Sequence, residues 1–128
     1  MTDRADRSSC SETPSDAARF AIDPAILARA EELARFRRDI HAHPELGFDT
    51  HRTVAKVREA LLAAGIPDEA LDATTLDGAL FVRLEGKGDG PVVALRADMD
   101  ALPMTDLGAN PWKSTVEGRA HACGHDGH

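Results

Sequence analysis

Apolar side chains recur at helical spacing in the stretch that begins at Asp23 and Pro24. Asp23 is a favourable N-cap residue and Pro24 suits the first turn of a helix, whereas the pair His43-Pro44 is typical of a helix end. The positions between them that share one face are Ile26, Leu27, Ala30, Leu33, Ala34, Arg37 and Ile40. This spacing predicts one helix from Pro24 to the residues just before His43.

A second helical pattern follows Thr50, which can serve as its N-cap. Gly65 and Pro67 supply a stop, because glycine favours the left-handed C-cap and proline cannot continue a helix. The apolar positions that share a face between cap and stop are Val54, Val57, Leu61 and Ala64. The sequence therefore predicts two helices joined by a short connection.

Two short β-rich runs come next, at residues 79–84 (ALFVRL) and 91–95 (PVVAL). The glycines between them permit a turn, so we expect the runs to pair, in an antiparallel step. The second run is almost continuously apolar, which is typical of a strand covered on both faces. Helices followed by buried strands predict an α/β fold with helices packed on a sheet.

Residues 1–19 are rich in Ser, Asp and Arg and lack apolar periodicity, which predicts a disordered polar leader. They also lack the apolar segment of a secretory signal, and no apolar run approaches the roughly 18 residues of a membrane span. The net charge of −7 argues against a nucleic-acid partner. Cys10 lies in the polar leader and Cys123 in a histidine-rich motif, so a reducing compartment, the cytoplasm, is expected.

Two carboxylates stand just after the second β-rich run, at Asp98 and Asp100. Side chains at i and i+2 project to the same side of an extended chain, so this pair could bind one metal ion or steer a catalytic base. Loops beyond the carboxyl ends of strands are also where α/β sheets gather their chemistry. The alternative is that both acids are solvated or cap the next turn.

The densest group of metal-ligand residues is the segment 121–128 (HACGHDGH). Cys123 and His125 stand at i and i+2, and thiolate and imidazole are good ligands for zinc and usable for manganese, cobalt or nickel. Asp126 and His128 project elsewhere and could support the ligands. Two ligands do not complete a site, so the others must come from elsewhere. The competing interpretation is a loop of histidines beside a small buried cysteine.

A different enzymatic interpretation makes Cys123 a nucleophile that a histidine activates. Cys-Gly-His is too close in sequence for ordinary triad geometry, so His121 or a distant histidine would have to serve as the base. A cysteine nucleophile with a more distant histidine base is therefore an alternative.

Three segments carry a family resemblance: residues 37–48 (RRDIHAHPELGF), 95–103 (LRADMDALP) and 118–128 (GRAHACGHDGH). They resemble the M20 metallopeptidase family, in its branch of amidohydrolases that act on N-acyl amino acids, such as hippurate hydrolase and auxin-conjugate hydrolases. The motifs occur in the expected order and cover about residues 33–128. The resemblance implies that residues 20–128 form the N-terminal portion of a zinc-peptidase-like catalytic domain, with helices packed on a mixed sheet.

The resemblance also implies roles for individual residues. Cys123 and His125 would bind one or both ions of a two-metal centre, with manganese or zinc favoured and cobalt or nickel as alternatives. Asp100 matches the carboxylate that orients catalytic groups, whereas Asp98 is not carried over as a ligand. Three further motif residues are expected to be structural, packing the first helix against the sheet: His41, His43 and Glu45.

The implied reaction is hydrolysis of the amide bond of an N-acyl amino acid, hippurate-like or related, by a metal-activated water whose proton passes to a carboxylate base. The family supplies that base from a Glu pair beyond the Cys-Gly-His segment, with further His ligands and a smaller lid and dimerisation domain. None of these lies within the 128 residues. We therefore expect no amidase activity from the 128-residue chain alone, and a homodimer only for a longer form.

Two functional classes thus remain open from the sequence. The chain is either the N-terminal piece of a working amidohydrolase or a catalytically inactive remnant. As a non-enzyme, it would be a small metal-binding module that binds one ion through four of its own residues.

Overall fold

The computed structural model describes residues 22–128, so the predicted leader at residues 1–19 lies outside the described residues. These residues belong to two compact units, of which the first ends at Leu33 and contains helix α2 (Pro24–Leu27). The second unit runs from Ala34 to His128. All three motif segments fall in the second unit, which therefore holds the candidate site.

Helix α3 (Ala30–Ala42) confirms the end of the first predicted helix before His43-Pro44. Asp23 also has the predicted capping role, because its Oδ1 accepts a hydrogen bond from the backbone N–H of Ala25 at 2.8 Å. The prediction of one continuous helix was wrong, since a turn separates α2 from α3. No proline or glycine marks this break, so the apolar spacing continues through it without a signal.

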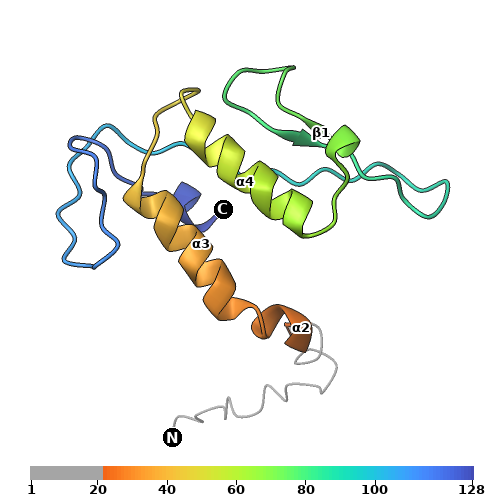
Figure 1. Ribbon diagram of the computed structural model, residues 1–128, viewed down its shortest axis with the longest axis horizontal. Helices are drawn as coiled ribbons and strands as arrows, with labels where there is room; N and C mark the ends of the chain where they lie inside the picture. The colour runs from red at the N-terminus through yellow and green to blue at the C-terminus, as the bar shows by residue number, and fades with distance from the viewer. Residues whose placement is uncertain (1–21) are drawn as a thin grey trace, which may run out of the picture. The chain divides into compact units, whose positions relative to one another are not determined.

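Helix α4 (His51–Ala63) confirms the second predicted helix, and it lies beside the second-unit part of α3 (Figure 1). The Asp39 carboxylate of α3 joins the two helices by accepting hydrogen bonds from Arg52 at 2.9 and 3.0 Å and by an ion pair with Lys56 at 3.4 Å.

Among residues 22–128, no helix is long and apolar enough to cross a membrane.

The N-terminal cap of α4 differs from the prediction. Thr50 occupies the N-cap position, but its hydroxyl donates to the carbonyl oxygen of Gly78 at 2.5 Å instead of bonding to the helix. The carboxylate of Glu45 caps the helix, accepting from the backbone N–H groups of Arg52 at 2.9 Å and Thr53 at 2.7 Å. The predicted structural role of Glu45 thus takes the form of a helix cap, supplied from outside the helix.

The C-terminal end of α4 follows the prediction. Gly65 has a φ of 88°, in the left-handed region that suits glycine after a helix. Its N–H donates to the carbonyl of Leu62, and the N–H of Ile66 donates to that of Leu61, both at 3.0 Å. This double pattern is the Schellman motif, which satisfies carbonyl groups that the helix leaves free.

The small sheet is only partly as predicted. Strand β2 (Phe81–Val82) lies within the predicted run 79–84, but its antiparallel partner is β1 (Leu71–Asp72), which the sequence did not indicate. The register pairs Leu71 with Val82. A single-turn helix, η1 (Asp68–Ala70), precedes β1 and brings it back alongside β2.

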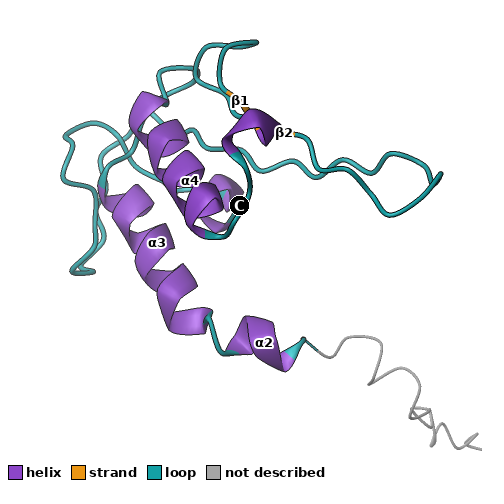
Figure 2. Cartoon of the chain, turned by 45° about the vertical axis from the view of Figure 1, so that its right-hand side comes forward, coloured by secondary structure: helices purple, strands orange, loops and turns teal. Residues whose placement is uncertain are grey.

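The predicted strand at residues 91–95 was wrong as an element of the described fold. The segment has no strand partner, and its apolar side chains are exposed rather than covered, with Val92 at 98% and Leu95 at 97%. A strand forms when hydrogen-bonding partners lie along its edges, and none of the residues from 22 to 128 pairs with this one. Figure 2 draws the chain that follows β2 as loop.

Backbone hydrogen bonds join the three motif segments to one another. The N–H of Ala101 donates to the carbonyl of Glu45 at 2.7 Å, and Leu102 and Ala120 exchange two bonds at 2.9 and 3.0 Å. A parallel bridge between Leu46 and Ala101 accompanies them. Segments that are far apart in sequence are therefore fixed side by side in the second unit.

Buried side chains are concentrated next to this junction and are mostly small. They are Pro44, Thr50, Thr53, Ala101, Ala120 and His121. Small side chains bury little apolar area, so the hydrogen bonds of the junction add to a modest contribution from packing.

Replacing Glu45 with glutamine is expected to lower the free energy of unfolding at neutral pH by about 1 kcal/mol, because a charged cap becomes a neutral one. Burial raises the pKa of Glu45, but the hydrogen bonds from Thr53 and Arg52 outweigh it and hold the pKa below its usual range. This stabilisation is present above the ordinary glutamate pKa and is lost as the pH falls through the lower folded value.

Urea unfolding of the wild type and Glu45→Gln, followed by circular dichroism from about pH 7 to pH 3, measures this effect. The difference between the two proteins should shrink on acidification. Exposed Glu59 lies on the same helix, so Glu59→Gln is the matched control. An equal loss in both variants at neutral pH would contradict the capping role.

Candidate metal and catalytic site

The junction of the motif segments places Asp100 and His125 next to each other. Asp100 directly precedes Ala101, and His125 follows Ala120 on the segment that pairs with Leu102. His125 lies in η2 (Gly124–Gly127), a single turn of 3-10 helix. The local structure therefore follows from the backbone pairing, which brings a carboxylate and an imidazole together across a separation of 25 positions in the sequence.

The His125 ring lies between the two predicted carboxylates. Its Nδ1 is 2.9 Å from Asp100 Oδ1, and its Nε2 is 3.8 Å from Asp98 Oδ2. The first contact has the distance of an ion pair but lacks hydrogen-bond geometry, so we treat it as electrostatic. Asp98 and Asp100 thus share one imidazole, one at each ring nitrogen, as their spacing at i and i+2 allows.

The negative charge of Asp98 is balanced by an arginine of its own segment. Arg96 donates to its Oδ1 from Nε at 2.8 Å and from Nη2 at 2.6 Å, and these hydrogen bonds hold the pKa of Asp98 below its usual range. His128 approaches the other oxygen, with Nδ1 3.5 Å from Oδ2. A carboxylate that is occupied by arginine is a poor metal ligand, which agrees with leaving Asp98 out of the ligand set.

Cys123 is half-buried with a free thiol, and its extended backbone precedes the turn that carries His125. Within residues 22–128, no hydrogen bond joins this thiol to an imidazole. The interpretation of Cys123 as a nucleophile with a neighbouring histidine base therefore gains no support from the geometry.

Asp126, beside His125, is anchored by α3. Arg37 donates to Asp126 Oδ2 from Nη2 at 2.5 Å and from Nε at 3.0 Å, and His41 Nδ1 lies 2.7 Å from Oδ1. Burial raises the pKa of Asp126, but the hydrogen bonds from His41 and Arg37 outweigh it and hold the pKa below its usual range. The carboxylate is therefore charged at neutral pH.

His41 thus does more than the packing role that the sequence suggested. Its second ring nitrogen, Nε2, lies 3.4 Å from Asp106 Oδ2, so the ring stands between two carboxylates. His43 faces its own helix, with Nδ1 2.7 Å from the carbonyl oxygen of Asp39. The two histidines of the motif therefore have different surroundings.

Asp106 is a structural residue of this site that sequence reasoning missed. It accepts hydrogen bonds from the backbone N–H groups of Ser114 and Gly108, both at 2.8 Å, and these lower its pKa from the usual range. An aspartate two residues before a glycine is a recognisable turn signal, which could have indicated the loop closure. The sequence around Asp106 contains no signal that would predict its contact with His41.

His121 is buried, with only 4% of its surface exposed, and neither ring nitrogen has a hydrogen-bond partner among the described residues. Burial lowers the pKa of His121, and this outweighs the attraction of Asp126, so the neutral imidazole is favoured. A buried polar group without a partner costs about 1–3 kcal/mol. Burial of the His121 ring without hydrogen bonds from the described residues is therefore expected to destabilise the fold.

The donor types of this site suit a divalent ion, but their number is too small. Thiol, imidazole and carboxylate are all available from Cys123, His125 and Asp100. Across residues 22–128, however, no three His, Cys, Asp or Glu side chains are gathered into a group that could hold a metal ion. The residues present therefore fit part of a metal centre, and the module that closes around one ion with four ligands of its own has no support here.

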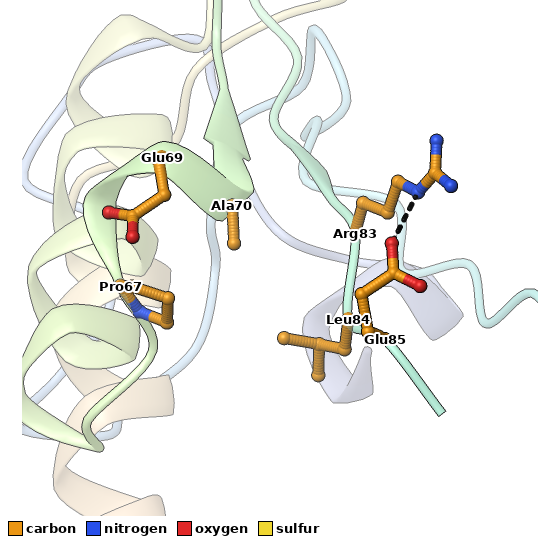
Figure 3. A pocket seen from close by; sticks show the side chains of 6 residues that line it. All are labelled: Pro67, Glu69, Ala70, Arg83, Leu84 and Glu85. Atoms are coloured by element: carbon orange, nitrogen blue, oxygen red, sulfur yellow. Dashed lines mark ion pairs between the residues drawn. The ribbon is translucent and has the colours of Figure 1, made fainter. Parts of the chain in front are cut away.

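A shallow hollow of about 480 Å³ lies beside the small sheet (Figure 3). Its walls carry an ion pair between Arg83 and Glu85, 3.2 Å apart, and the polar atoms face outward. The residues that line it are Pro67, Glu69, Ala70, Arg83, Leu84 and Glu85. It contains none of the candidate metal or catalytic residues.

Comparison with known proteins gives a consistent family. Residues 94–128 match the profile of peptidase family M20/M25/M40. The chain is 45% identical over 96 residues to an N-acetylcysteine deacetylase of Bacillus subtilis, covering 75% of this chain and 25% of that protein. It is 41% identical over 97 residues to an N-acyl-L-amino acid amidohydrolase of Geobacillus stearothermophilus, covering 76% of this chain and 25% of the relative.

The fold shows the same relationship. A crystal structure from Bacillus subtilis, of a protein described as a dinuclear metal-binding peptidase of the M20 family, aligns with a TM-score of 0.72 and 41% identity. The alignment covers 80% of this chain and 28% of that one. The helices and the small sheet are therefore part of an M20 peptidase fold, and this chain belongs to the M20 peptidase family. It spans about a quarter of the length of the relatives that it matches.

Proposed function

We propose that residues 20–128 are the N-terminal portion of the catalytic domain of a metal-dependent amidohydrolase that cleaves the amide bond of N-acyl amino acids. The observation that carries this proposal is the junction of the three motif segments, which puts Asp100 against His125, 2.9 Å apart. The names of the relatives, an N-acetylcysteine deacetylase and an N-acyl-L-amino acid amidohydrolase, support the substrate class.

Cys123 and His125 are the proposed metal ligands, and Asp100 is the proposed catalytic residue that orients His125. When bound, the divalent ions would polarise the amide carbonyl and activate the attacking water. A carboxylate close to one ring nitrogen favours one orientation of an imidazole ligand by electrostatic attraction and leaves the other nitrogen for the ion. Because Asp100 lies next to Nδ1 of His125, the nitrogen that would bind the ion is Nε2.

The proposed cofactor is a pair of divalent ions, in agreement with the neighbour that is described as dinuclear. Manganese and zinc are favoured, and cobalt and nickel are alternatives, since a thiolate and an imidazole bind all four. Because this chain contributes two ligands, the remaining ligands and the carboxylate base have to come from other parts of the complete protein.

The substrate preference within the class is proposed to be hippurate-like or related conjugates. For the complete protein we propose a homodimer and a cytoplasmic location, the latter because the cysteine of the histidine-rich motif would need a reducing compartment to remain a free ligand.

The test compares the complete native protein, captured from its source cells with an antibody against residues 24–60, with the 128-residue chain. Both are incubated with manganese or zinc and with N-acetylcysteine, N-acetylleucine or hippurate, and the released amino acid is quantified. We expect metal-dependent release by the native protein and none by the 128-residue chain, which lacks the base. A native protein without amidase activity on any of these substrates would contradict the proposed function. Release by the 128-residue chain would contradict the proposed source of the base.

A further inference from the structure

Arg37 and His41 lie on the same face of α3, because residues at i and i+4 are neighbours on a helix surface. Both side chains reach the carboxylate of Asp126, which is 89 and 85 positions away in the sequence. His41 and Asp126 are mostly buried, each with about 15% or less of the side chain exposed. The contact thus connects the helix of the first motif to the turn of the third.

Each oxygen of Asp126 is engaged. Oδ2 accepts two hydrogen bonds from the guanidinium of Arg37, and Oδ1 is 2.7 Å from Nδ1 of His41. Charge-assisted contacts of this kind define direction as well as distance, because the guanidinium is planar and the imidazole is rigid. The carboxylate is therefore held in one orientation by two side chains of one helix.

The backbone of the turn is only weakly held by itself. η2 is one turn of four residues, with Gly124 and Gly127 at its ends. Its internal hydrogen bonds are long, 3.3 Å from the N–H of Asp126 to the carbonyl of Cys123 and 3.2 Å from that of His128 to His125. Short 3-10 turns with glycine at both ends have little intrinsic stability. The place of this turn depends on what its side chains contact.

We propose that Arg37 and His41 are positioning residues that set the turn carrying His125, and with it Cys123, by fixing the intervening Asp126. This inference rests on the proposed metal-binding role of Cys123 and His125 and adds the residues that preorganise it. Neither positioning residue has to touch the ion or the substrate. Their effect passes through Asp126, which is adjacent to His125.

The test uses variants of the complete native protein in a Cys10→Ser background, where Cys123 is the one remaining thiol of residues 1–128. Cobalt(II) titration reports the sulfur-to-cobalt absorption of Cys123, and hydrogen exchange by mass spectrometry reports the order of residues 123–128. Arg37→Ala and His41→Ala are expected to weaken cobalt binding roughly 10- to 100-fold. They should also speed exchange in this peptide, with the exchange of α4 unchanged.

Conservative variants separate positioning from general structural damage. His41→Asn keeps an N–H donor near the place of Nδ1 and should restore most of the binding, whereas His41→Gln places its donor near Nε2 and should not. The matched controls are His43→Ala, at the end of the same helix, and Arg35→Ala, at an exposed position of it. Both controls should resemble the wild type.

Exchange and binding that are the same in His41→Ala as in His43→Ala would overturn the proposal, as would equal rescue by His41→Gln and His41→Asn. If the complete protein in the Cys10→Ser background binds no cobalt, the proposed metal site fails. Hydrogen exchange then still decides whether Arg37 and His41 order the turn, so the two failures are distinguishable.

Discussion

Replacing either Cys123 or His125 with alanine is expected to remove specific metal binding from the complete protein. Each change deletes one of the two ligands that this chain is proposed to supply. Loss of an outer hydrogen-bond partner of a ligand already costs about 10- to 100-fold in affinity, so loss of the ligand itself should cost more than about 100-fold. Metal content after dialysis, measured by plasma mass spectrometry, checks this for each variant.

His43→Ala is the control for this experiment, because His43 belongs to a motif but has its Nδ1 directed to the carbonyl oxygen of Asp39. It should retain the wild-type metal content. If His43→Ala loses as much metal as His125→Ala, the ligands have been assigned to the wrong residues. Full metal content in Cys123→Ala would contradict the assignment of Cys123 as a metal ligand.

Replacing Gly78 with alanine should destabilise the fold by roughly 3 kcal/mol or more. Gly78 has a φ of 73°, where an L side chain is strained, and a Cβ at this position would overlap the carbonyl oxygen of Phe48. The obstacle is backbone and cannot turn away as a flexible side chain could. The same residue accepts the hydrogen bond of the buried Thr50 hydroxyl, so any shift also disturbs the start of α4.

Gly47→Ala provides the matched comparison for Gly78→Ala. Gly47 also has a positive φ, 55°, but nothing lies within 4 Å of the position that its Cβ would take. This variant should show the strain alone, about 1 kcal/mol, and a small decrease in the thermal midpoint. Gly78→Ala should lower the midpoint by roughly 10 °C or more. Equal midpoints in the two variants would contradict the close approach of Gly78 to Phe48.

The helices could be predicted because their signals are local. The cap at Asp23 and the stop at Gly65 act within a few residues, and the apolar face of α4 repeats at the spacing of one turn. The break between α2 and α3 could not be predicted, since it lies in residues with good helical character. The cap of α4 was assigned to Thr50, but Glu45 supplies it from a neighbouring segment.

The sheet was harder to predict because strand pairing is not local. An apolar run such as 91–95 indicates what a segment could bury, but it does not identify the partner. In the described chain β2 pairs with β1, and Val93 of the apolar run is 80% exposed. Residues 91–95 have the composition of a buried strand, and the described residues supply nothing that covers them.

In the candidate site, too, local features could be predicted from the sequence and long-range contacts could not. Asp98, Asp100 and His125 were predicted from residue type and spacing, and their side chains do meet. The contact between His41 and Asp126 spans 85 positions, and no pattern in either motif reveals it. Residue type and spacing therefore single out Cys123 and His125 as candidate ligands, whereas the contacts between their turn and α3 are found only from the fold.

X-ray absorption spectroscopy of the complete protein with its native metal tests the central claim most directly. A sulfur at about 2.3 Å from the ion, as in zinc-thiolate sites, is the predicted result. It should persist in Cys10→Ser and disappear in Cys123→Ser. A metal environment of nitrogen and oxygen alone, or a sulfur that remains in Cys123→Ser, would contradict the assignment of Cys123 to the metal centre.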